Sequence, residues 1–200
     1  MFSFKGFQTQ DKNTHLEHLE DDIINRGAKG GENAINFLKS VRNMLAGSSG
    51  GVNMTVKWDG APAIICGVNP ENGKFFVGTK SVFNKTPKIN YTTSDIRKNH
   101  DGVVAKKLQV CLANLSRLNI KGILQGDLLF TDDLKAINID GEKMISFTPN
   151  TITYAVPINS DLGKRIARAK MGIVFHTSYS GKTMDKLSAS FGTVRGSSNR

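Results

Sequence analysis

The sequence is poor in cysteine and contains no long apolar run. Only two of its 200 residues are cysteines, and Cys66 and Cys111 stand singly in apolar segments, so neither a disulfide framework nor a zinc ribbon organises the fold. No segment reaches the roughly 18 apolar residues of a membrane-spanning helix, and the N-terminus lacks the apolar core of an export signal. We therefore expect a protein with no membrane partner that keeps its thiols reduced in the cytoplasm.

Acidic residues are also scarce relative to basic ones. The chain has 17 Asp and Glu against 27 Lys and Arg, a net charge of +10. Residues 71–107 hold eight basic and three acidic residues, and residues 160–200 hold eight and two. This excess favours a polyanionic partner such as nucleic acid. A solvated face is the alternative for the basic helix expected over residues 160–170.

A Gly/Ser-rich stretch divides the chain into two parts. Apolar residues at helical spacing predict two helices before it, the second over residues 32–46. Residues 47–51 then read Gly-Ser-Ser-Gly-Gly, the composition of a flexible connector. We expect a helical preface over residues 1–51 and a second domain over residues 52–200.

The second part combines short β-rich segments with helices. Strands are expected over residues 52–58, 63–68, 75–79, 122–130, 144–148, 151–156 and 172–177, and helices over about 102–118 and 160–170. The short turn at residues 69–73 implies antiparallel pairing of the strands that flank it. The expected fold class is α+β, a mainly antiparallel sheet with helices packed on it.

The segment Thr55–Gly60 carries the clearest chemical pattern, because a lysine ends an apolar strand and an Asp-Gly turn follows. A lysine amine is a nucleophile only when it is unprotonated, a state that desolvation or neighbouring cations favour. Lys57 is therefore a candidate nucleophile. The alternative is an ordinary surface lysine before a turn.

The sequence Lys57-Trp58-Asp59-Gly60 resembles the K-x-D-G motif of the covalent nucleotidyltransferase superfamily, which includes ATP-dependent DNA ligases, RNA ligases and mRNA capping enzymes. Two further segments, 76–81 and 122–129, resemble later motifs of this family in the expected order. In the second of them Asp127 replaces the glutamate of the family. The aromatic residue that faces the base is expected at Phe175, with Tyr154 as the competing candidate.

The resemblance implies that Lys57 attacks the α-phosphate of ATP with the help of Mg²⁺ and forms a covalent lysyl-AMP. It implies that Lys80 contacts phosphate or ribose, and that Asp127 binds a ribose hydroxyl or the metal ion. The implied core is a sheet of the ligase adenylation-domain type. The residues expected to bind the nucleotide are Asp59, Gly60, Lys80, Asp127 and Phe175.

Two later motifs of the family have no full counterpart. Residues 170–174 have the shape of its Glu-Gly strand but lack the glutamate, and no closing K-x-K strand follows Thr177. We therefore expect a polynucleotide ligase that is a reduced or truncated member of phage or microbial type. It is expected to act in the cytoplasm, which for a phage-encoded protein is that of the host. The alternative is a non-catalytic nucleic-acid-binding or virion-associated module with the same fold. The sequence pattern fits ATP or GTP as the nucleotide and RNA or DNA as the acceptor. It fits any oligomeric state.

Overall fold

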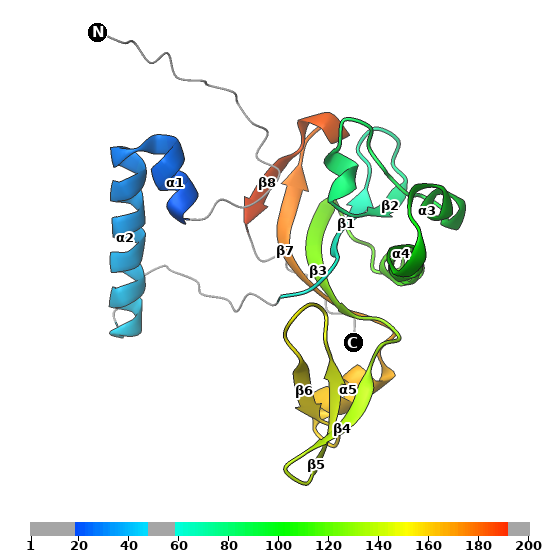
Figure 1. The fold of residues 1–200 in the computed structure, drawn as a ribbon. Coiled ribbons are helices and arrows are strands. Elements are labelled where there is room, and N and C mark those ends of the chain that lie inside the picture. Colours follow the sequence, from blue (N-terminus) through cyan, green and yellow to red (C-terminus); the bar gives the residue numbers. More distant parts are fainter. Residues whose placement is uncertain (1–18, 48–58, 192–200) are drawn as a thin grey trace. The chain divides into compact units, whose positions relative to one another are not determined.

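The computed structural model describes residues 19–47 and 59–191 of the chain (Figure 1). These residues fall into two compact units, a helical unit over residues 19–47 and a sheet unit over residues 59–191. The expected strand 52–58, with the candidate nucleophile Lys57, and most of the 47–51 connector lie outside the described residues. No helix in the described ranges is long and apolar enough to cross a membrane.

The helical unit consists of α1 (Leu19–Arg26) and α2 (Ala28–Leu45), which are joined by Gly27 in a left-handed conformation with φ of 56°. Helix α2 begins earlier than residue 32, the expected start. Gly30 packs directly against the backbone carbonyl of Asp22, and a side chain at this position would collide with it. Gly30 therefore allows the close approach of α1 and α2.

The sheet unit is built on a five-stranded sheet in the order β2-β1-β3-β7-β8, in which all neighbouring strands are antiparallel. We call it the main sheet. Its strands are β1 (Ala63–Val68), β2 (Phe75–Gly78), β3 (Ile123–Phe130), β7 (Gly172–Ser180) and β8 (Ser188–Phe191). The α+β class with antiparallel pairing is thus confirmed. Strand β8 lies in the polar tail where no strand was expected.

A smaller module is inserted between β3 and β7, and it lies beyond one end of the main sheet (Figure 1). We call residues 131–171 the insertion module. It has its own antiparallel sheet in the order β4-β5-β6. Its elements are β4 (Lys135–Ile139), β5 (Glu142–Phe147), β6 (Tyr154–Pro157) and α5 (Asp161–Arg168).

Helices pack on the main sheet, and its two faces bury separate apolar clusters. Helix α4 (Gly102–Leu115) covers one face, with Leu108, Cys111 and Leu115 buried as the helical spacing predicts. The opposite face buries a second cluster that includes Ile65, Phe76 and Val82. The remaining short helices are η1 (Lys80–Phe83), α3 (Thr93–Asn99) and η2 (Met184–Lys186).

The two thiols are expected to be unreactive in the folded protein. Cys66 and Cys111 are fully buried, and burial raises the pKa of each thiol to about 12. At about pH 8 a thiol reagent should modify both cysteines after denaturation and neither before, since only an accessible thiolate reacts. Rapid modification of one cysteine in the native protein would contradict this placement.

The raised pKa of the two thiols lowers the stability of the fold at alkaline pH. Thiols of the unfolded chain have a pKa of about 8.5, whereas burial raises the pKa of the two thiols in the folded chain to about 12. The unfolded state therefore loses these protons first. The contribution of the thiols to the free energy of unfolding decreases as pH rises above about 8.5.

Candidate functional site

The Asp-Gly turn of the motif lies directly against strand β3. Ala63 pairs with Asp127 in the antiparallel ladder, and the amide of Leu128 donates to the carbonyl of Pro62 at 3.2 Å. A Cβ atom added to Gly60 would lie 2.9 Å from the Cβ of Asp127 and 2.7 Å from the carbonyl oxygen of Leu128. Only glycine permits this approach, so the fold brings the motif and the Gly-Asp strand into contact.

Asp59 ties the same turn to the insertion module. Its amide donates to the hydroxyl of Tyr154 at 3.2 Å, and its carboxylate accepts from the side-chain amide of Asn150 at 3.1 Å. Tyr154 in turn stacks on Phe147, with ring centroids 5.5 Å apart. Tyr154, the competing aromatic candidate, therefore lies beside the motif.

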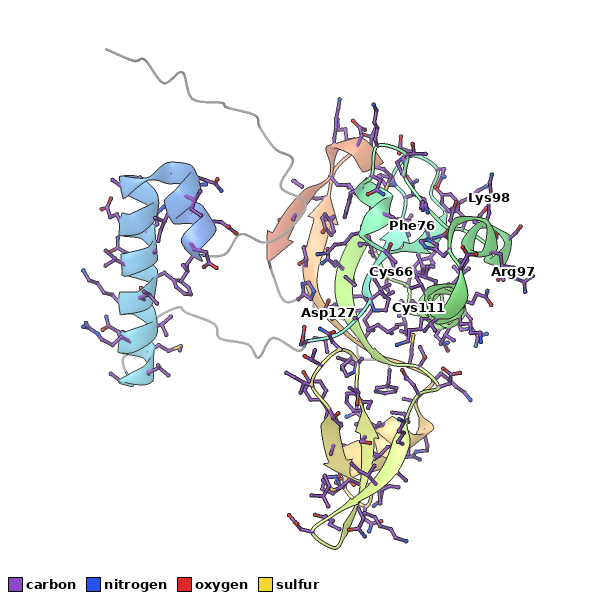
Figure 2. All side chains as sticks on the ribbon, viewed as in Figure 1. Cys66, Phe76, Arg97, Lys98, Cys111 and Asp127 are labelled. Atoms are coloured by element: carbon purple, nitrogen blue, oxygen red, sulfur yellow. The ribbon has the colours of Figure 1, made fainter. Side chains whose placement is uncertain are left out.

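Asp127 faces a histidine that the sequence analysis did not select. The Nε2 atom of His176 lies 3.6 Å from the Oδ1 atom of Asp127, and its Nδ1 atom lies 2.8 Å from the hydroxyl oxygen of Thr177. The side chains of Asp127 and His176 are 13% and 26% exposed. A carboxylate at this depth needs a polar partner, and His176 supplies it. Figure 2 shows Asp127 at the end of the main sheet nearest the insertion module.

An irregularity in β7 explains why His176 points toward Asp127. Gln125 pairs with Thr177 and Gly126 pairs with Phe175, so His176 is an extra residue in the ladder. Such a β-bulge re-aims side chains locally. A regular strand would place His176 and Thr177 on opposite faces of the sheet, whereas here they are in contact.

Phe175 lies on the other face of the main sheet from Asp127. It packs with Leu128 in the apolar cluster covered by α4, and the side chains of consecutive residues in a strand point to opposite faces. Its ring also lies against Gly126, 2.9 Å from the position of an added Cβ atom. The stacking role of Phe175 stays a prediction, and Tyr154 is the aromatic candidate in contact with the motif.

Lys80 begins η1, two residues after the end of β2. Gly78 pairs with Ile65, and Val82 of η1 packs in the apolar cluster that contains Ile65 and Ile123. The side chain of Lys80 is exposed. Within the described ranges Lys80 and Asp127 form no ion pair. The phosphate-binding role of Lys80 stays a prediction, as does the role of Lys57.

A cavity of about 520 Å³ lies next to Tyr154, between the insertion module and the adjoining ends of β3 and β7. Its walls are mainly apolar and include Phe130 and Val174, and among the described residues that line it Arg165 carries the charge. This volume falls within the usual range for small-molecule sites.

The described residues contain no group of three or more His, Cys, Asp or Glu side chains that can hold a metal ion by themselves. Mg²⁺ commonly binds one or two carboxylates together with waters and substrate phosphates. Asp127 fits that requirement, because it is a carboxylate at the site with only one oxygen directed at His176.

Residues 13–199 match a protein family described as a family of unknown function (DUF6267), and the chain therefore belongs to this family. No curated protein matches the sequence, and no solved structure matches it.

Tyr154→Phe tests whether the bond to the Asp59 amide matters for chemistry. Loss of the hydroxyl should reduce stability by about 1 kcal/mol and also slow the reaction proposed below. Tyr91→Phe is the matched control, because that hydroxyl accepts from Asn69 and Asn72 away from the motif. Urea denaturation should show a loss in both variants, and only Tyr154→Phe should react more slowly. Equal reaction rates would show that this bond is merely structural.

Proposed function

We propose that the protein is a nucleotidyltransferase that forms a covalent lysyl-AMP at Lys57 and transfers the AMP to the 5′-phosphate of a polynucleotide, as a ligase does. One observation carries the proposal. Gly60 of the K-x-D-G motif packs on Asp127 of the Gly-Asp strand, and β1 continues as the ladder partner of that strand. Two segments that resemble separate motifs of one family are thus neighbours in space.

In the proposed reaction, the unprotonated Nζ atom of Lys57 attacks the α-phosphorus of ATP. A nitrogen–phosphorus bond forms, and the bond from the α-phosphorus to the oxygen bridging the β-phosphate breaks. Pyrophosphate leaves with the electron pair, and the amine releases one proton to water. Positioning and stabilisation of the phosphate charge supply most of the catalysis in such transfers.

The remaining residues have positioning and binding roles in this proposal. Lys80 neutralises phosphate charge, and Tyr154, which lines the adjacent cavity, offers its ring to the base. Asp127 accepts from a ribose hydroxyl or holds Mg²⁺, which when bound neutralises charge on the triphosphate. His176 fixes the orientation of the Asp127 carboxylate.

The proposal is tested by intact-mass analysis of the full chain after incubation with ATP and Mg²⁺. The expected result is a mass increase of one AMP that is acid-labile, as a phosphoramidate bond is, and that disappears when pyrophosphate is added. GTP in a parallel reaction identifies the preferred nucleotide. Absence of any adduct with either nucleotide would refute the proposed activity.

A second candidate function is a nucleic-acid-binding module that retains the fold without the reaction. The observation in its favour is Met171, which stands where the resembled Glu-Gly motif has glutamate and packs against the apolar cluster under α4. That position supplies no carboxylate to a metal ion. Salt-sensitive binding of nucleic acid without any adduct would support this second function.

A further inference from the structure

We propose that the exposed surface formed by Lys80, Lys85, Lys88, Arg97 and Lys98 binds the phosphate backbone of a polynucleotide strand. We call these residues the basic surface. The inference rests on the proposed function, because it names the part of the molecule over which the acceptor strand of that reaction runs. All five side chains are exposed.

Hydrogen bonds join the loop after β2 and helix α3 into one surface. The carbonyl of Ser81 accepts from the amide of Lys88 at 3.1 Å, which closes a loop that also contains Lys85. The ammonium of Lys88 donates to the carbonyl of Asn99 at the end of α3, at 3.0 Å. Figure 2 shows Arg97 and Lys98 on α3, pointing away from the main sheet.

The basic surface has little acidic charge to neutralise it. Within residues 80–100 the sole carboxylate is Asp95. It accepts from the hydroxyl and the amide of Thr92 and from the amide of Tyr91, and these bonds, with a smaller effect of the charge of Lys98, lower the pKa of Asp95. Asp95 is therefore directed at the N-terminus of α3. The next acidic residue in the sequence is Asp101, which follows His100.

The environment of His100 is consistent with a positive potential at this surface. His100 follows α3, and its pKa is lowered by burial and by the charge of Lys88, while Asp101 acts in the opposite direction. The imidazole is therefore neutral near pH 7. His100 therefore adds no charge to the basic surface at this pH.

The proposed function favours a strand over a compact anion as the ligand of this surface. Lys80 belongs both to the basic surface and to the proposed nucleotide site. A polynucleotide whose 5′-phosphate reaches that site can continue over Lys85 and Lys88 toward α3, with successive phosphates near successive cations. Release of counterions from such contacts makes binding depend strongly on salt.

The test measures binding of a 5′-phosphorylated, 3′-fluorescein-labelled single-stranded RNA to the full chain by fluorescence anisotropy at several KCl concentrations. The variant replaces Lys85, Lys88 and Lys98 by alanine and leaves Lys80 in place. Its affinity should be about tenfold weaker at low salt, and the slope of log K against log salt should decrease by about two.

The matched control replaces Lys121, Lys135 and Lys143 by alanine. These lysines are exposed and lie elsewhere on the sheet unit. Their replacement changes the net charge by the same amount as the Lys85/Lys88/Lys98 variant. The control should bind RNA like the wild type. An equal loss in both triple variants would show that only net charge matters and would overturn the proposal, as would undetectable binding of RNA by the wild type. Binding of poly-glutamate as tight as that of RNA would overturn the assignment to a polynucleotide.

The outcome for this surface is separable from the outcome for the proposed function. Without RNA, the Lys85/Lys88/Lys98 variant should form the AMP adduct at the wild-type rate. RNA binding that is lost in this variant, in a protein that never forms an adduct, would refute the ligase activity and support the surface. Adduct formation together with unaltered RNA binding in the variant would support the ligase activity and refute the binding role of the basic surface.

Discussion

The Lys57→Ala variant is expected to form no AMP adduct. Alanine has no nucleophilic atom, and loss of a catalytic nucleophile commonly reduces rates by on the order of a thousandfold or more. The adduct peak expected of the wild type after incubation with ATP and Mg²⁺ should therefore be absent from its mass spectrum. The fold should be unaffected, which circular dichroism and urea denaturation check.

Two controls separate the nucleophile from its charge. Lys57→Arg keeps a positive charge but places a guanidinium where the amine stood, and it should be as inactive as Lys57→Ala. Lys121→Ala removes an exposed lysine in the loop before β3, and it should react like the wild type. An adduct of unchanged yield in Lys57→Ala would mean that another residue is the nucleophile, and the K-x-D-G assignment would be wrong.

The second large effect is expected for Gly60→Ala. The added Cβ would lie 2.7 Å from the carbonyl oxygen of Leu128 and 2.9 Å from the Cβ of Asp127, so the turn must move away from β3. A displacement of about 1 Å in a catalytic arrangement can cost about a hundredfold in rate. Overpacking of this kind costs about 1–3 kcal/mol in stability. The rate of adduct formation and the urea midpoint measure the two effects.

Gly31→Ala is the comparison for this substitution. Gly31 lies within α2, has no left-handed backbone angle and has open space around its Cα atom. Alanine there should leave adduct formation unchanged and stabilise the helix by about 0.5–1 kcal/mol. A wild-type rate in Gly60→Ala would show that the contact between the turn and β3 is not part of the reactive site.

Periodicity predicted the elements whose apolar residues face the core. Strand β1 begins and ends where expected, and β3 and α4 differ from expectation only at their ends. Helix α3 was missed because Thr92 and Asp95 cap it while Ile96 is its only buried residue. Strand β4 was missed because its pattern is almost entirely exposed; it exists as the ladder partner of β5.

The candidate site was partly predictable. The resemblance selected Asp127, but it did not identify His176. A β-bulge depends on the register of two distant strands, and no local pattern in residues 172–177 shows it. The contact of Asp59 with Asn150 and Tyr154 depends likewise on how the insertion module folds back on the turn.

The way the insertion module joins the main sheet has a consequence for how the family can diversify. Phe130 and Gly172, the residues that flank the module, are ladder partners, so its two points of attachment are adjacent. Insertions and deletions within it can be accommodated without displacing β3 or β7. Because Asn150 and Tyr154 reach the turn from this module, changes in its length can alter the contacts made to the turn while the strands of the main sheet stay unchanged.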